Sequence, residues 1–134
     1  MITALRDQTG MQRVTQAMGA VTAAYGGLVI AAPRVFARQL GYDGPGEPSS
    51  AVRIVCASLG ARDVVSGVSM IVAPPGRARW AALGARCVAD LSDAVVFGTL
   101  LPSHKARTKV AFVAAGWGVL CGLSGVLGSH SRSA

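Results

Sequence analysis

Charged residues are scarce in this sequence. Asp, Glu, Lys and Arg make up 14% of its 134 residues, whereas 51% are hydrophobic. A soluble domain carries about 25% charged residues, and the mean hydropathy of +0.47 points in the same direction. We therefore expect much of the protein surface to face a lipid bilayer rather than water.

Aromatic residues are also few, at 5% of the chain. Proteins that bind nucleic acids combine clustered basic residues with aromatic side chains on which bases stack. Here the net charge of +7 is spread over short segments that flank apolar blocks, as in the loops of membrane proteins. The pattern argues against a nucleic-acid partner.

The cysteines and histidines do not form a metal-binding pattern. Cys56, Cys87 and Cys121 lie apart inside apolar blocks, without a CxxC motif, and His104 and His130 have no second ligand at metal spacing. No phosphate-binding glycine loop or Ser/His/Asp set can be assembled either. We expect no metal, no cofactor and no catalytic residue, so the sequence does not indicate an enzyme.

Four apolar blocks dominate the chain. Each is about as long as the 20 helical residues needed to cross a hydrocarbon core of about 30 Å. They cover residues of about 14–33, 53–73, 80–101 and 110–128. The sequence thus predicts an all-α, integral membrane bundle of four transmembrane helices, in one domain over residues 1–134. An even number of spans places both termini on one side of what we expect to be a bacterial cytoplasmic membrane.

Small residues recur along the first and last blocks. They stand at every fourth position, which places them on one face of each helix. Such faces let helix backbones approach closely within a membrane. The predicted helix-packing residues are Gly19, Ala23 and Gly27 in the first block and Ala114, Gly118 and Gly122 in the last.

Ionised side chains stand near the middle of the second and third blocks. The second holds Arg62 and Asp63, and the third holds Arg86, Asp90 and Asp93. A charge at the centre of a membrane helix costs about 2.5–3.5 kcal/mol, so five unpaired ones would cost on the order of 15 kcal/mol. If the two helices fold back on each other, Asp63 lies level with Asp90. We therefore expect the five side chains to pair in a seam inside the bundle.

This predicted seam has two interpretations. Two arginines meet three carboxylates, so one acid is in excess unless Arg53 reaches the seam or one carboxyl keeps a proton. Such an acid inside a membrane can carry protons or bind a ligand. Buried Arg/Asp networks also simply fix which helices pack and in what register. The sequence leaves both interpretations open.

The segments GARD (60–63) and RCVADLSD (86–93) resemble those of a family of small four-span membrane proteins of bacteria and fungi, the DUF4267 type. The chain is also loosely similar in size and span number to DoxX-like membrane proteins. The resemblance implies a four-helix integral membrane fold. It implies no activity, because the function of the DUF4267-type family is undetermined.

Three functions are consistent with this pattern. The first is a non-enzymatic protein that acts by association, as a homo-oligomer or an accessory subunit of a membrane complex, because two small-residue faces exceed what one bundle needs. The second is a proton-coupled small transporter, or a membrane protein that binds an apolar ligand or lipid, using the aspartates of the seam. The third, an enzyme acting on a lipid, lacks a recognisable nucleophile.

Overall fold

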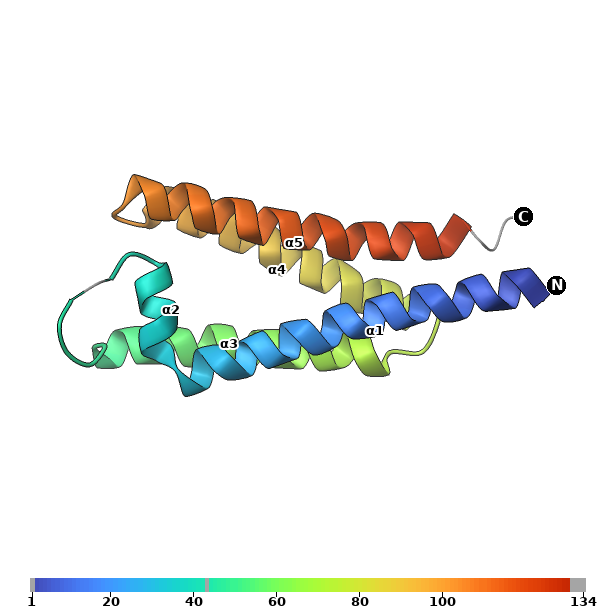
Figure 1. Cartoon of the computed structure of the whole chain (residues 1–134), viewed down its shortest axis with the longest axis horizontal. Helices are drawn as coiled ribbons and strands as arrows, with labels where there is room; N and C mark the ends of the chain where they lie inside the picture. The colour runs from blue at the N-terminus through green and yellow to red at the C-terminus, as the bar shows by residue number, and fades with distance from the viewer. Residues whose placement is uncertain (1, 43, 131–134) are drawn as a thin grey trace.

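The computed structural model describes residues 2–42 and 44–130, with side chains for residues 12–42 and 44–126. This part of the chain is built of helices joined by short connections (Figure 1). The helices are α1 (Ile2–Ala31), α2 (Pro33–Gln39), α3 (Ser50–Val72), α4 (Arg77–Leu100) and α5 (His104–His130). The prediction of an all-α fold is confirmed within these residues.

A proline, a serine cap and a glycine set several of the helix ends. Pro33 has no backbone N–H and starts α2, so the chain bends after Ala31 instead of continuing α1. The hydroxyl of Ser49 accepts a hydrogen bond from the backbone N–H of Val52 (3.3 Å) and caps the start of α3. Gly76 has a φ of +105°, a conformation that favours glycine, and makes the turn into α4. These local signals divide the chain into separate helices.

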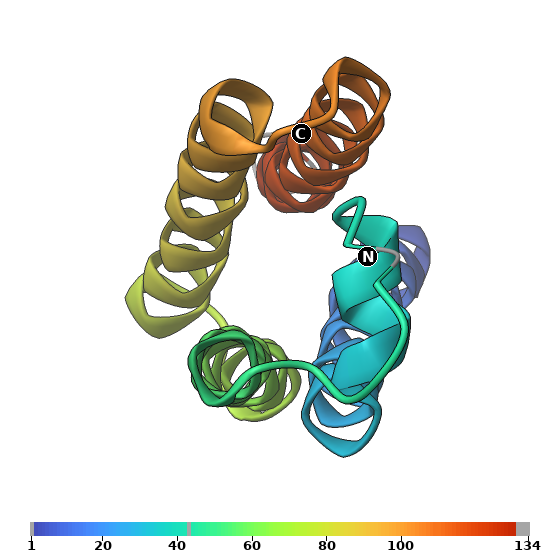
Figure 2. The same cartoon turned by 90° about the vertical axis from the view of Figure 1, so that its left-hand side faces the viewer.

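The four long helices form two tight pairs. α1 packs along α3 and α4 packs along α5, whereas the contacts of α1 with α5 and of α3 with α4 are much sparser. Seen end-on, the helices follow one another around a ring in the order α1, α3, α4, α5 (Figure 2). The start of α1 and the end of α5 lie at the same end of the bundle, and α2 crosses the opposite end (Figure 1).

Three of these helices are long and apolar enough to cross a membrane. The candidate spans are Gln12–Ala31 in α1, Ser50–Val72 in α3 and His104–Val126 in α5. The prediction of four spans is met only in part, because α4 is not among them. Its 24 residues are long enough, but every 18-residue stretch of it contains Arg86, Asp90 and Asp93. These three charges make α4 less apolar than the other long helices.

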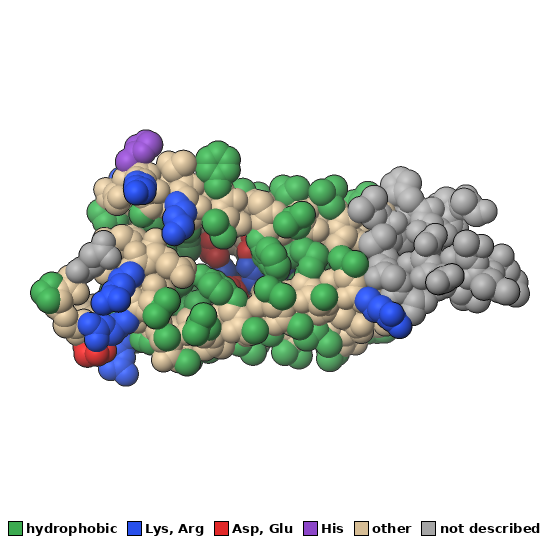
Figure 3. All heavy atoms as spheres, viewed as in Figure 1, with side chains coloured by type: hydrophobic (Ala, Val, Ile, Leu, Met, Phe, Trp, Pro, Cys, Tyr) green, Lys and Arg blue, Asp and Glu red, His purple; other side chains and the backbone are tan. Residues whose placement is uncertain are grey.

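The distribution of side chains differs from that of a soluble protein. Large apolar side chains are exposed on every long helix, and several polar or charged ones are buried. The buried polar residues are Thr15, Thr22, Asp63, Arg86, Asp90 and Ser124. Figure 3 shows apolar side chains over the middle of the visible face and basic ones toward its two ends. Soluble monomers rarely expose so continuous an apolar surface.

Glycines bring α1 and α3 into backbone contact. A Cβ atom added to Gly19 would lie 2.6 Å from the carbonyl oxygen of Gly67, and one added to Gly26 would lie 2.5 Å from that of Gly60. Ala23 lies beside Gly67 in the same interface. The absence of side chains at these glycines is what allows the two helices to approach so closely.

Gly27 does not belong to this interface. No atom lies within 4 Å of a Cβ added there, whereas its neighbour Gly26 is buried against α3. A step of four residues advances about 400° around a helix, so a constant four-residue stripe drifts away from the contact face. The buried face instead alternates steps of four and three, through Thr15, Gly19, Thr22 and Gly26.

The small residues of α5 also lie inside the molecule. Gly118 faces Asp90 of α4, and Gly122 faces the sulfur of Cys87. Ala114 lines the cavity described below. Two of the three predicted packing residues of the last block therefore contact α4 within this chain, and the third lines the cavity.

We expect Gly26→Ala to lower stability and Gly27→Ala to leave it unchanged or raise it. A methyl group at position 26 meets the backbone of α3, and overpacking costs about 1–3 kcal/mol, against a helix-propensity gain of about 0.5–1 kcal/mol. At position 27 only the gain applies. Unfolding by SDS titration in mild detergent, followed by circular dichroism, measures both. Equal effects of the two substitutions would contradict this packing.

Candidate functional site

The interior of the bundle has an apolar cluster toward each end and charged groups between them. The cluster nearer α2 joins Leu40, Leu101 and Ala106, with Phe36, Phe97 and Val110 packed against them. The cluster at the other end joins Met70, Leu83 and Cys121, with Met18, Ala82, Cys87 and Trp117 around them. Along α4, Asp90 and Asp93 lie between the positions that belong to the two clusters.

Arg86 of α4 is only 4% exposed, and each of its three guanidinium nitrogens donates a hydrogen bond. Nε and Nη2 donate to the two carboxylate oxygens of Asp90, one turn further along α4, with Nε to Oδ2 at 2.8 Å. Nη1 donates to Oδ1 of Asp63 (2.7 Å) and to the hydroxyl of Ser66 (3.2 Å) on α3. Gly118 of α5 leaves room for the Asp90 side chain.

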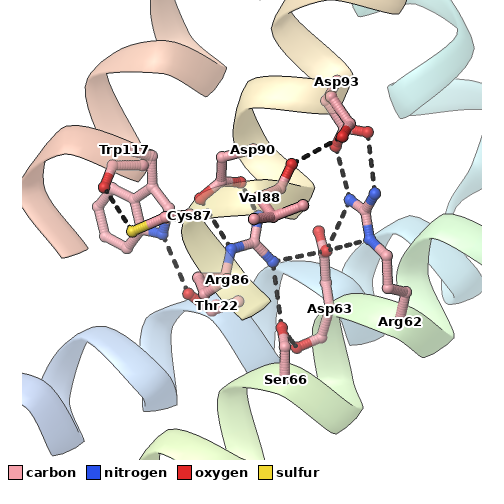
Figure 4. A network of polar contacts seen from close by, with 12 residues as sticks. Thr22, Arg62, Asp63, Ser66, Arg86, Cys87, Val88, Asp90, Asp93 and Trp117 are labelled. Carbon is pink, nitrogen blue, oxygen red and sulfur yellow. Dashed lines mark hydrogen bonds and ion pairs between the residues drawn. The ribbon is translucent and has the colours of Figure 1, made fainter. Parts of the chain in front are cut away.

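Arg62 of α3 forms a second two-pronged pair. Its Nη1 and Nη2 donate to Oδ1 (2.9 Å) and Oδ2 (2.6 Å) of Asp93 on α4. Its Nε and Nη2 also donate to Oδ1 of Asp63, at 3.2 and 3.0 Å. Asp63 therefore accepts hydrogen bonds from both arginines (Figure 4). Planar guanidinium groups suit such paired contacts with carboxylates.

The five side chains form one line of alternating charge, which we call the ionic network. Its order is Asp93, Arg62, Asp63, Arg86, Asp90. The network crosses from α3 to α4, where direct contacts between helices are sparse. Its two ends differ in exposure, because the Arg86 and Asp90 side chains are 5% and 3% exposed and those of Arg62 and Asp93 are 34% and 19% exposed.

A cavity of about 320 Å³ lies beside the ionic network. All five residues of the network line it, together with side chains from α1, α2 and α5. In Figure 3, acidic and basic side chains are visible inside a hollow between α1 and α5, with apolar side chains around it. The cavity therefore opens at the side of the bundle, onto its apolar surface.

Aromatic side chains form much of the cavity wall. Four of the seven aromatic residues of the chain line it: Tyr25, Phe36, Phe97 and Trp117. Tyr25 meets Phe36 edge-on, with ring centroids 6.4 Å apart, and its hydroxyl donates to Oε1 of Gln39 at 3.1 Å. The indole N–H of Trp117 donates to the hydroxyl of Thr22 (3.1 Å), which links α5 to α1. The walls are thus mainly apolar, with a few fixed polar groups.

The structure brings together the five charged residues that the sequence singles out, and it leaves Arg53 outside. Arg53 is exposed on α3 and does not line the cavity. The sequence gives a signal for two wall residues, because Phe97 follows Asp93 by four residues and Leu59 precedes Asp63 by four, so each shares a face with a charged residue. The wall residues of α1 and α5 have no such marker, because their place depends on how the two helix pairs meet.

Comparisons of the chain with protein-family models, with curated proteins and with solved structures found no match. Within the described residues, no group of three or more His, Cys, Asp or Glu side chains is arranged to hold a metal ion. The geometry itself indicates what the site can do. A laterally open cavity with apolar walls and charged groups on one side suits an amphipathic molecule.

We expect Arg86→Met to destabilise the protein by about 3–5 kcal/mol, because it leaves Asp90 without its partner in the interior. Removing both partners, in Arg86→Met with Asp90→Leu, should restore much of that loss. The control is Arg34→Gln, which breaks an exposed pair with Glu47 and should cost about 0–1 kcal/mol. SDS titration in mild detergent compares the four proteins, and similar losses for the Arg34 and Arg86 variants would contradict a buried network.

Proposed function

We propose that this is an integral membrane protein whose four long helices cross the bilayer, and that its lateral cavity binds an amphipathic small molecule or lipid. The observation that carries the proposal is a cavity inside the bundle with aromatic walls, charged groups on one side and an opening onto the apolar surface. A bacterial cytoplasmic membrane is the expected location.

The fourth span is supported by where the side chains of α4 point. Its central charges pair inside the bundle, so they need not meet lipid. Its outward side chains are large and apolar. The exposed ones are Trp80, Val88, Leu91, Val95, Val96 and Leu100. A helix of this kind can lie in lipid although its average composition is less apolar.

Ligand binding is supported by the cavity's size and position. Its volume of about 320 Å³ lies within the range of about 300–1,000 Å³ typical of small-molecule sites. An opening between α1 and α5 would admit a molecule directly from the bilayer. The polar part of such a molecule would lie near Arg62 and Asp93, which are the more exposed members of the ionic network.

Association with other subunits is a second candidate function. It is favoured by small residues on the outer face of α1, at steps of four, three and four: Ala20, Ala24, Gly27 and Ala31. A face of this kind supports contacts between membrane helices. A homo-oligomer or larger membrane complex formed there would leave the lateral cavity open.

Membership of the DUF4267-type family is part of the proposal. The two segments that carry the resemblance, 60–63 and 86–93, contain all five residues of the ionic network. If the resemblance is one of ancestry, these segments share a role in joining α3 to α4 beside the cavity.

We expect the connections on either side of α4 to lie on opposite sides of the membrane. In a background without the three native cysteines, Pro75→Cys should react with a membrane-impermeant maleimide from one side only. Pro102→Cys and Glu47→Cys should react only from the other side, since two spans separate Glu47 from Pro102. Labelling of Pro75→Cys and Pro102→Cys from the same side would show that α4 does not cross.

We also expect a brominated monoacylglycerol, a neutral amphiphile, to quench the fluorescence of Trp117 in a saturable way. The Trp80→Phe variant leaves Trp117 as the sole tryptophan of the chain, and bromine quenches tryptophan on contact. Ala114→Phe, which fills the cavity from α5, should remove the saturable part. Val119→Phe adds the same side chain on the outer surface of α5 and should retain it. Quenching that is unsaturable in all variants would contradict ligand binding.

A further inference from the structure

The ionic network carries one negative charge in excess. It contains two arginines and three aspartates, so its formal charge is −1 when every member is ionised. Among the described side chains, Arg62 and Arg86 are the cations within ion-pair distance of these carboxylates. An uncompensated charge away from water is costly. A third positive charge beside the network, from a proton or from a bound cation, would remove this excess.

Neither Arg53 nor Lys109 lies within ion-pair distance of these carboxylates. Arg53 lies outside the cavity. Lys109 lines the cavity, but at its α2 end: Gly98 lies beside Ala111, so Lys109 is about 10 Å further along the bundle axis than Asp93. Lys109 is exposed in the second turn of α5, where its ammonium group can extend to water.

The same cavity contains the chemistry that recognises organic cations. Its wall has four aromatic side chains, and the faces of aromatic rings attract ammonium-type groups, more strongly where water is absent. Asp90 and Asp93, the two acidic ends of the network, both line the cavity, and the Asp93 side chain is the more exposed of the two, at 19% against 3%. The excess negative charge and the aromatic rings therefore line the same cavity.

Resting on the proposed function, we propose that the ligand is a lipophilic monovalent cation. Its apolar groups occupy the aromatic part of the cavity, and its positive charge lies near Asp93. One positive charge brings the ionic network to neutrality. An anionic amphiphile would instead raise the excess to two negative charges, and a neutral one would leave it uncompensated.

The test compares two ions of the same shape and opposite charge, tetraphenylphosphonium and tetraphenylborate. The protein, as Trp80→Phe in nanodiscs of uncharged lipid, is titrated with each ion and followed by Trp117 fluorescence. Equilibrium dialysis against empty nanodiscs subtracts partitioning into lipid. We expect saturable binding of tetraphenylphosphonium that is at least tenfold tighter than that of tetraphenylborate.

Variants of the Arg62–Asp93 ion pair distinguish the effect of the network's net charge from the effect of losing a structural contact. Asp93→Asn makes the network neutral and should weaken tetraphenylphosphonium binding at least tenfold. Arg62→Gln raises the excess negative charge and should retain or tighten binding. The double variant returns to the native formal charge and should regain much of the binding that Asp93→Asn loses. If Asp93→Asn does not fold, Arg62→Gln and the double variant still test the charge dependence.

A merely structural role for the pair predicts a different result. Both single variants would then weaken binding to a similar extent, and that outcome would overturn the inference. Equal binding of the two ions, or tighter binding of tetraphenylborate, would also overturn it. In these cases saturable quenching by the brominated monoacylglycerol would leave the proposed function standing, whereas loss of that signal as well would remove both.

Discussion

The pairing of arginine with aspartate inside the bundle is the interaction on which the rest of this structure depends. Within each helix pair, glycines and other small residues allow close backbone contact, as at Gly26 and Gly60. Between the pairs such contacts are sparse, and in lipid no hydrophobic force would drive the pairs together. The ionic network supplies the link between α3 and α4, because separating its members would leave charges unpaired in the interior.

The same interaction accounts for the cavity. Two helices that meet through glycine leave no space between them, whereas helices joined through arginine side chains are held apart by the length of those side chains. The two apolar clusters close the space toward either end of the bundle. The opening that remains lies between α1 and α5, which are linked by the hydrogen bond from Trp117 to Thr22. The bundle therefore consists of two firm pairs with a looser interface, and the cavity lies in that interface.

Much of this arrangement follows from local patterns in the sequence. Apolar blocks of the right length predict the long helices, and five charges within two such blocks predict that they pair, because the alternative is too costly. Gly27 shows the limit of a regular four-residue spacing, which drifts off the contact face between α1 and α3 after about two turns. The aromatic walls could not be predicted for a different reason. Tyr25 and Trp117 stand in uncharged blocks far apart in sequence, and only the relative position of the two helix pairs brings them to one cavity.

The number of members in the ionic network bears on whether it is only structural. A line of alternating charges with an odd number of members carries the charge of its ends, and here both ends are aspartates. At one end, Asp90 is sealed beneath Gly118 of α5. At the other, the Asp93 side chain is more exposed, and both aspartates line the cavity. Two arginines and two aspartates, Asp63 and Asp90, would already join α3 to α4 without any excess charge. The fifth member, Asp93, adds a second link between α3 and α4 through its two hydrogen bonds with Arg62, and it brings the excess negative charge to the cavity wall.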